Sequence, residues 1–425
     1  MSAAFQKYKY YLLTLAIAIA YLIIRSQSVA GDFKVFLSAA DYLNHGQNPY
    51  KVWLVWKGAV TDKYFYGPAF AAMLAPLTYL PEQVAFFVFF FIQVILLMRA
   101  FVVISTMLPI SGLNDKQKLW WWILTILFSL RFILHNIEFG QVTILIFYLS
   151  IEGLYQIFYR SKLLGSLLLG LAIHIKVMPL VFIPYLLWRR EFVPALLSLV
   201  FFGLYWLTPL AFGNTRFAAQ LFSDWCYTVN PVGERFVQHQ EQLGYQMQGL
   251  QALLSAYLLD SGFEKLNFKF NVIVLSQPVF QTILQLSRLL FVVFTLYFLN
   301  GSFLKPYAKD NKGFWQLSYL FMVMPIIFPQ QQKYSLLLMT PFFAYMLWWI
   351  ITSSKNRDRR WNLTVIYFAF IILLTTFTSD LFVGMTLNYL FQCMRILTMA
   401  MILAVPLLAW AKPVEEKDHP LTKSL

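Results

Sequence analysis

"PEQVAFFVFFFIQVILLMRAFVVISTML", residues 81–108, is a long apolar and aromatic run whose charged side chains are Glu82 and Arg99. About 20 apolar residues in a helix are enough to cross the hydrocarbon core of a bilayer. The run therefore predicts a membrane-spanning helix.

The composition extends this prediction to the whole chain. Of its 425 residues, 60% are hydrophobic and 12% are charged, which is too few charges to cover a soluble protein of that length. Helices satisfy their own backbone hydrogen bonds in lipid. We therefore expect an all-α polytopic membrane protein, with residues 1–425 forming a single integral-membrane domain.

The formal charge of +14 follows membrane topology and does not indicate a nucleic-acid partner. Lys and Arg gather in short loops between apolar runs, as in "WRRE", "LKPYAKDNKG" and "SSKNRDRR". Such loops remain cytoplasmic. We expect both termini to be cytoplasmic and ten to twelve helices to cross the membrane. The predicted spans lie near 10–25, 81–108, 119–134, 140–158, 193–212, 278–300, 314–329, 334–352, 361–378 and 388–411.

Residues 163–188 are flanked by basic clusters, Arg160 and Lys162 before them and Arg189 and Arg190 after them. One span would place these clusters on opposite faces of the membrane. A hairpin of two short helices, turning near His174, Lys176 and Pro179, keeps both basic ends inside. It also buries Lys176 near the outer side, where an ionisable group usually serves a purpose.

The first external loop is predicted at 26–80. Its apolar residues recur at helical spacing, with polar residues on the other side, and so predict an interfacial helix. The apolar set is Phe33, Phe36, Leu37, Ala40 and Leu43, and the polar set is Lys34, Ser38 and Asp41. Gly46 and Asn48-Pro49 end this helix.

A second long external loop, residues 213–277, has the mixed polarity of short helices that cap an external cavity. Trp225, Arg235, Gln238 and Gln248 either contact sugar there or pack the cap. Cys226 and Cys393 are too few for a disulfide framework. The N-terminus is a first span or, alternatively, a signal peptide cleaved after Ala30.

Four stretches carry a family resemblance: "GDFKVFLSAADYLNHGQNPY", "FYGPAFAAMLAPLTYLP", "FGQVTILIFYLSIEGLY" and "GLAIHIKVMPLVFIPYLLWRR". In order and spacing, over about the first 190 residues, they resemble glycosyltransferase family 87. Gln248 fits the family's Asn-Gln-Ser segment. Gln331, Gln332 and Lys333 stand where the family often has a Ser-Trp-Asp-His-like stretch.

The resemblance implies a GT-C-type fold and an inverting transfer of a sugar, mannose, from a polyprenyl phosphate to a lipid or glycan acceptor. It implies a location in the bacterial inner membrane, with the active site on the periplasmic side among membrane lipids. No cofactor is expected, because the lipid-linked sugar is itself the substrate.

The resemblance also implies that Asp32 is the general base, and the chemistry agrees. A phosphate leaving group needs no acid, so one carboxylate that takes the acceptor's proton can suffice. The leaving phosphate needs cations or strong donors. We predict Lys176 and Lys333 for this role, with Gln332 and Arg131 behind them.

Each of these residues also has a structural interpretation. Asp32 precedes a helix and can be its N-cap, which is compatible with catalysis. Asp41 and Asp62 are weaker base candidates, better explained as charges on the helix face and in the loop.

Substrate contacts are predicted for Tyr66, His135, Glu138, Gln141 and Gln248, although helix termination and packing also explain Tyr66 and Gln141. His135 and Glu138, three residues apart, can ligate a metal, but no clear third ligand accompanies them. No metal is therefore expected.

A transporter or lipid flippase is the rival from another functional class, because interrupted helices and an intramembrane lysine suit it equally. A catalytically inactive family member acting as a scaffold is a third possibility.

Overall fold

The computed structural model describes residues 19–27, 31–230, 243–260, 262–263, 266–300, 303–307, 309–329, 331–354 and 358–413. Its contacts divide the chain into two compact units. The first unit comprises Met1–Val103, Ile133–Ile183 and Phe192–Gly233, and the second comprises Ile104–Phe132, Pro184–Glu191 and Glu234–Leu425.

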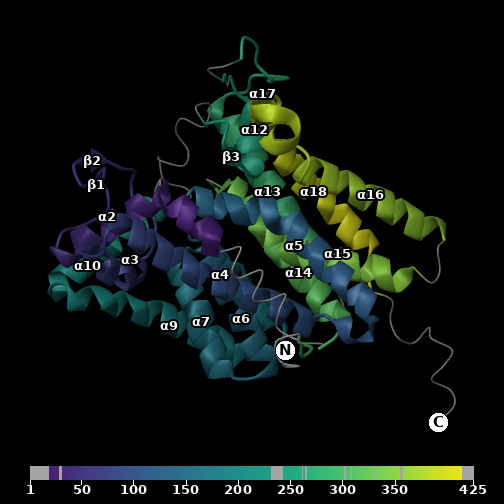
Figure 1. Ribbon diagram of the computed structural model, residues 1–425, viewed down its shortest axis with the longest axis horizontal. Coiled ribbons are helices and arrows are strands. Elements are labelled where there is room, and N and C mark those ends of the chain that lie inside the picture. The colour runs from purple at the N-terminus through teal and green to yellow at the C-terminus, as the bar shows by residue number, and fades with distance from the viewer. Residues whose placement is uncertain are drawn as a thin grey trace. The chain divides into compact units, whose positions relative to one another are not determined.

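The first unit begins with helical residues 19–26 and is otherwise built from short and long helices (Figure 1). They are α2 (Asp32–Asn44), α3 (Pro68–Leu74), η1 (Ala75–Tyr79), most of α4 (Glu82–Met107), the end of α5 (Asp115–Glu138), α6 (Thr143–Tyr159), α7 (Lys162–Ile175), η3 (Met178–Val181), α9 (Phe192–Leu204), η4 (Tyr205–Ala211) and α10 (Thr215–Val229). Strands β1 (Val55–Trp56) and β2 (Ala59–Val60) form an antiparallel hairpin.

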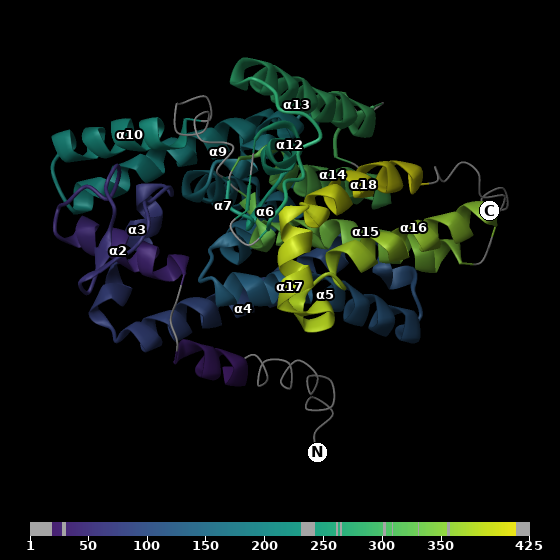
Figure 2. The same ribbon diagram turned by 90° about the horizontal axis from the view of Figure 1, so that it is seen from above.

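The second unit holds the rest of the described elements. They are η2 (Ile110–Gly112), most of α5 and of α8 (Phe182–Trp188), β3 (Met247–Gln248), α12 (Leu250–Leu258), α13 (Gln277–Leu299), α14 (Asn311–Ile327), β4 (Gln331–Gln332), η6 (Lys333–Met339), α15 (Thr340–Ser353), α16 (Arg359–Thr375), α17 (Asp380–Cys393) and α18 (Ile396–Trp410). Strand β3 pairs antiparallel with β4. Helices α16 and α18 pack side by side, as both ribbon views show (Figures 1 and 2).

The all-α polytopic class is confirmed. Among the described residues, five helices are long and apolar enough to cross a membrane, or six if α16 and α17, bent by 74°, form one broken span. The five are Glu82–Met107, Asp115–Glu138, Phe192–Ala211, Gln277–Leu299 and Lys333–Ser353. Four shorter apolar helices accompany them, so the total of ten to twelve stays a prediction. The single-domain organisation also stays a prediction.

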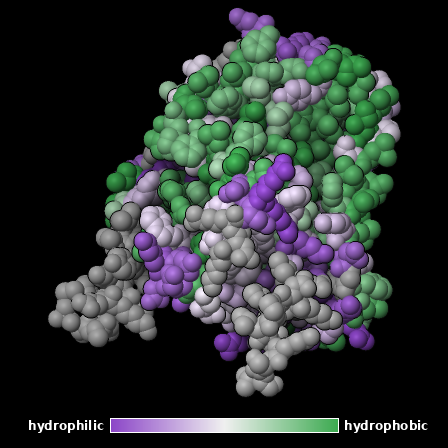
Figure 3. All heavy atoms as spheres, turned by 90° about the vertical axis from the view of Figure 1, so that its right-hand side faces the viewer, coloured by the Kyte–Doolittle hydropathy of each residue, from purple (hydrophilic) through white to green (hydrophobic). Residues whose placement is uncertain are grey.

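Exposed apolar side chains recur along the lipid-length helices. On α13 they include Leu286, Leu289, Leu290, Val292 and Val293, each more than half exposed. Apolar residues also cover much of the face drawn in Figure 3. Apolar surface of this extent is typical of contact with lipid.

The predicted span near 388–411 is interrupted in the structure. Arg395 adopts a left-handed φ of 58° between α17 and α18. Its buried guanidinium donates hydrogen bonds to the carbonyls of Leu243, Gly244, Tyr245 and Met247. These bonds satisfy a buried cation that a continuous apolar helix could not accommodate.

Helix α7 packs closely between α6 and α9 (Figure 1). A Cβ at Gly165 would press on the carbonyl of Gly153 in α6, and a Cβ at Gly170 would lie 2.7 Å from the carbonyl of Ser198 in α9. Small residues at such crossings allow membrane helices to approach each other. Helix α7 is therefore held closely against both neighbours.

The helix predicted in the first loop exists as α2, but more of it is buried than an interfacial helix requires. Ser38, expected on its polar side, is fully buried and donates its hydroxyl to the Lys34 carbonyl at 2.8 Å. Lys34 and Asp41 do keep partial exposure, as the amphipathic pattern predicts. In the predicted cap at 213–277, the structure has helices α10 and α12. Arg235, Gln238 and the Ala30 cleavage position lie outside the described residues.

Candidate active site

The site begins at the first turn of α2. Gly31 is the N-cap residue, with φ 70° and ψ −150°, and no side chain caps the helix. Asp32 is the first helical residue, so the prediction that it is the N-cap is wrong. Its carboxylate is consequently not used by the backbone of its own helix.

Gly31 allows the start of α2 to approach the turn between α5 and α6. Its positive φ favours glycine, and a Cβ at this position would overlap the backbone of Phe139. The amide of Asp32 donates to the Phe139 carbonyl at 2.9 Å. Residues more than a hundred positions apart in sequence thus meet at one backbone contact.

Gln141, just after this turn, holds the Asp32 carboxylate. Its Nε2 donates to Oδ2 of Asp32, and its side chain is 1% exposed. Gln93 of α4 braces the turn, because its side chain donates to the Gln141 carbonyl at 3.4 Å and accepts from the Leu145 amide at 3.2 Å. Gln141 was predicted from the sequence, whereas Gln93, which lies inside an apolar run, was not.

Lys176 reaches the same site from the end of α7. It is the C-cap of this helix, and its backbone amide donates to the Ala172 carbonyl at 3.1 Å. The amide of Gly67 donates to the Ile175 carbonyl at 3.3 Å, while a Cβ at Gly67 would overlap the backbone of His174. The Gly-Pro step that opens α3 therefore needs glycine for this close approach.

Tyr66 lines the same region but is mostly occupied in packing. Its ring meets Phe36 edge to face with centroids 5.0 Å apart, and its carbonyl accepts the Tyr50 hydroxyl at 2.7 Å. The side chain is 7% exposed. Its predicted substrate contact stays a prediction.

Burial and neighbouring charges shift the two principal ionisable groups. The pKa of Asp32 is raised to about 6. Burial is the main cause and the charge of Asp62 adds to it, while the hydrogen bond from Gln141 and the charge of Lys176 oppose the increase. Burial lowers the pKa of Lys176 to about 8, and the charge of Asp32 opposes this. The two groups therefore interact electrostatically, and near pH 7 Asp32 is a carboxylate and Lys176 is an ammonium.

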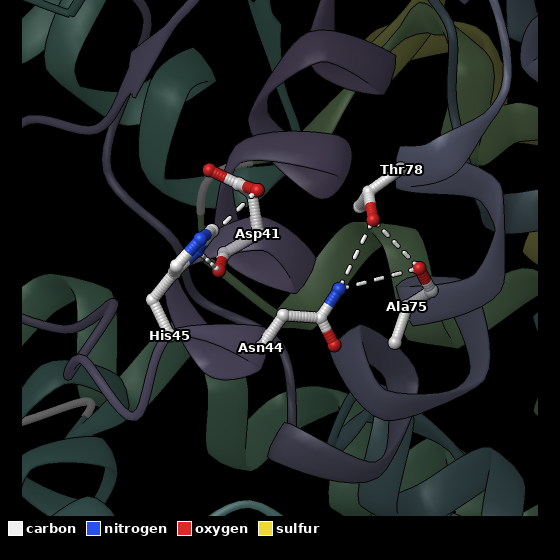
Figure 4. A network of polar contacts seen from close by, with 5 residues as sticks. All are labelled: Asp41, Asn44, His45, Ala75 and Thr78. Atoms are coloured by element: carbon white, nitrogen blue, oxygen red, sulfur yellow. Dashed lines mark hydrogen bonds and ion pairs between the residues drawn. The ribbon is translucent and has the colours of Figure 1, made fainter.

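The other end of α2 is fixed independently. Asn44 donates to the Thr78 hydroxyl at 3.0 Å and to the Ala75 carbonyl at 3.4 Å, while His45 lies 3.6 Å from the Asp41 carboxylate (Figure 4). The two bonds of Asn44 anchor α2 on η1. Asp41 contacts His45 at this end of α2 and does not belong to the group around Asp32.

His135 and Glu138 lie on the last turns of α5 and face each other, with Nδ1 and Oε2 separated by 3.7 Å. The His135 ring also packs on Phe139 with centroids 4.1 Å apart. The pair thus lies at the turn that carries Gln141. Among the described residues, no group of three His, Cys, Asp or Glu side chains could hold a metal ion. Metal independence stays a prediction.

The second unit brings together another part of the predicted set. Gln248 on β3 pairs in register with Gln331 on β4, and Met247 pairs with Gln332. Lys333 follows directly as the first residue of η6. The Gln248 side chain accepts a hydrogen bond from the Thr398 hydroxyl at 3.0 Å. No sequence pattern indicates that Gln248 and Gln332 belong to one small sheet.

Arg131 also lies in the second unit, where its guanidinium holds the break between α16 and α17. It donates to the Thr375 carbonyl at 2.6 Å, to the Thr378 hydroxyl at 2.8 Å and carbonyl at 3.4 Å, and to Asn388 at 3.3 Å. A phosphate would have to share these donors. The phosphate role predicted for Arg131 stays a prediction.

The sequence profile of glycosyltransferase family 87 matches residues 64–329. The chain belongs to glycosyltransferase family 87. No curated protein matches the chain. The family resemblance predicted from sequence is confirmed, and the protein is a membrane glycosyltransferase.

The matched region of the glycosyltransferase covers most of the predicted site, namely Tyr66, Arg131, His135, Glu138, Gln141, Lys176 and Gln248. It begins after Asp32 and ends before Gln332 and Lys333. Asp32 is linked to the matched region by its contacts with Phe139 and Gln141.

For a glycosyltransferase, the group around Asp32 has the parts of a proton-transfer site. One carboxylate oxygen is held by Gln141, which leaves the other for a hydroxyl donor. The amide oxygen of Gln141 is buried and has no hydrogen-bond partner among the described residues. A carboxylate held in this way, with an ammonium nearby, can take a proton while the positive charge faces an anion.

Proposed function

We propose that this glycosyltransferase moves a sugar, mannose, from a polyprenyl phosphate to a lipid or glycan acceptor on the periplasmic side of the bacterial inner membrane. The observation that carries the proposal is the electrostatic interaction between Asp32 and Lys176 in a member of family 87. The transfer needs no metal and inverts the anomeric carbon.

In the reaction, Asp32 takes the proton of the acceptor hydroxyl as the hydroxyl oxygen bonds to the anomeric carbon. The bond between that carbon and the phosphate oxygen breaks, and its electron pair leaves with the polyprenyl phosphate. The leaving group gains one negative charge, which a nearby cation stabilises. The electrostatic interaction of Lys176 with Asp32 supports this role for Lys176, and Lys333 and Gln332 are further candidates.

Burial of Asp32 supports its role as base. A carboxyl group with a pKa of about 6 is ionised at neutral pH yet more basic than an exposed aspartate. The Gln141 contact aims the carboxylate, so the acceptor hydroxyl meets a fixed oxygen. Gln141, His135, Glu138, Tyr66 and Gln248 are the proposed substrate contacts.

The test starts with the lipids that co-purify with the protein, identified by mass spectrometry. Transfer is then measured in proteoliposomes with those lipids and with a panel of polyprenyl-phosphate sugars. We expect a bound polyprenyl-phosphate sugar and transfer of mannose to an added acceptor. Movement of the lipid across the bilayer without any transfer would instead establish the rival transporter or flippase.

A further inference from the structure

Five aromatic residues of the first unit form what we call the aromatic cluster. Phe202, Tyr205 and Trp206 contact the His174 ring, and Phe222 and Trp225 pack on Trp206. They come from α9, η4 and α10. Trp206 is central to the cluster, with ring centroids 4.9 Å from His174, 4.9 Å from Phe222 and 5.0 Å from Trp225.

Two hydrogen-bond donors inside this cluster have no acceptor in the part of the chain that the structure describes. The indole Nε1 atoms of Trp206 and Trp225 are both buried without a hydrogen-bond partner among the described residues. The Trp225 side chain as a whole is 6% exposed. A buried donor left unpaired costs free energy, and buried tryptophans usually find an acceptor.

Other indoles of the same chain do find one. Trp56 donates to the Glu82 carboxylate at 3.1 Å, Trp121 to the Ala344 carbonyl at 2.8 Å and Trp315 to the Leu408 carbonyl at 2.8 Å. The two indoles of the aromatic cluster differ from these three in having no acceptor among the described residues. Their ring centroids lie 5.0 Å apart. Two neighbouring unpaired donors suit a ligand that brings its own oxygens.

The cluster's surroundings indicate an uncharged ligand. Its rings are apolar and its unpaired indole groups are neutral. The carboxylate of Asp224, next to Trp225 in sequence, is already bound by Lys51 at 2.6 Å and by Asn48 at 2.7 Å. Apolar aromatic faces with a few fixed donors are typical of a small-molecule site.

We propose that the aromatic cluster binds a neutral sugar ring, with the Trp206 and Trp225 N–H groups donating to its oxygens and the aromatic rings packing on its C–H surface. The choice of a sugar as the ligand rests on the proposed function. Phe222 is 47% exposed and covers Trp206 edge to face. The sugar reaches the two donors when this side chain swings aside.

The cluster is connected to the group around Asp32 through His174. The amide of Ala69, in the first turn of α3, donates to His174 Nε2 at 3.2 Å, and Lys176 follows two residues later. A sugar bound at the cluster is therefore the donor's own ring or a ring of the acceptor chain. Both sources share the same hydroxyl and ether oxygens.

The experiment is a titration of the purified full chain by isothermal calorimetry, with methyl α-mannoside, a methyl α-mannobioside and polyprenyl-phosphate mannose as probes. Trp206→Phe and Trp225→Phe keep an aromatic ring but remove the N–H. Each should weaken binding about tenfold, as expected for one lost hydrogen bond. Trp56→Phe, which removes an indole N–H that is already bonded, is the matched control and should leave the affinity unchanged.

Weaker binding of the free glycosides identifies an acceptor ring, and weaker binding of the lipid-linked sugar alone identifies the donor ring. Unchanged affinity for all three probes in both variants would overturn the proposal, and so would a wild-type chain that binds none of them. If the glycosides bind through the two indoles but no polyprenyl-phosphate sugar supports transfer, the proposed function fails while the sugar site stands. If either indole variant fails to fold, the same glycosides are titrated against Phe222→Ala. A glycoside affinity of Phe222→Ala equal to that of the wild type would contradict the proposal.

Discussion

Asp32 combines a carboxylate held by one side chain with an environment that opposes its ionisation. Gln141 binds one oxygen, and burial raises the pKa to about 6. A purely structural aspartate at a helix start would instead be stabilised as the anion by backbone N–H groups. The residue is therefore better suited to proton transfer than to capping.

The rate of transfer should depend on pH with two limbs. Transfer needs Asp32 ionised, so kcat/KM should rise with pH up to about 6, the pKa of this carboxyl group. It also needs Lys176 protonated, so kcat/KM should fall above about 8. A pH profile of kcat/KM in proteoliposomes measures both limbs.

Asp62→Asn provides the control for this profile. The negative charge of Asp62 raises the pKa of Asp32, so its removal should shift the acidic limb to lower pH and leave the basic limb in place. An acidic limb that stays at the same pH in Asp62→Asn would show that the limb does not report Asp32.

Helices α3 and α7 are held together where Gly67, before α3, packs closely against His174 of α7. Gly67→Ala places a Cβ against the backbone of His174, which must then move. We expect a loss of about 1–3 kcal/mol in stability, typical of overpacking, and a loss of transfer because Lys176 shifts with α7. Thermal unfolding and the transfer assay measure the two effects.

Gly203→Ala is the matched control in the same unit. Gly203 lies in α9, and a Cβ there meets nothing within 4 Å. The substitution should leave transfer unchanged and stabilise the helix by about 0.5–1 kcal/mol. Equal stability losses in Gly67→Ala and Gly203→Ala would contradict the role of the α3–α7 contact.

The break between α16 and α17 is held by the guanidinium of Arg131. Arg131→Lys removes the planar fork that binds Thr375, Thr378 and Asn388. We expect thermal stability to fall by about 1–3 kcal/mol and the KM for the lipid donor to stay unchanged. Lys176→Gln should raise the KM for the lipid donor and leave thermal stability unchanged, because it removes a cation at the reaction site. A raised donor KM in Arg131→Lys with unaltered stability would support the phosphate role predicted from sequence.

For the whole molecule, sequence patterns predicted the class but not the boundaries of its spans. Long apolar runs and basic loops were sufficient for an all-α membrane protein, because both follow from the physics of the bilayer. The break at Arg395 was missed, because it depends on carbonyls about 150 residues earlier in the chain. Local hydropathy carries no information about such a contact.

The site was predicted in its residue types and only partly in its arrangement. Asp32, Gln141 and Lys176 were recognised in separate motifs, and the structure brings all three together in the first unit. The capping role of Asp32 was wrong. Gly31, which approaches Phe139 closely, is the N-cap, so the helix begins one residue earlier than predicted. The unpaired indoles of Trp206 and Trp225 leave no mark in the sequence at all.

Replacement of Asp32 by asparagine separates a role as the base of sugar transfer from a structural role. Asp32→Asn is compared with wild type in proteoliposomes, with donor binding and transfer measured on the same sample, and Asp41→Asn as the control on the same helix. We predict that Asp32→Asn binds the donor, keeps its thermal stability and loses transfer by at least about a hundredfold, while Asp41→Asn behaves as wild type. Transfer by Asp32→Asn at the wild-type rate would contradict the account.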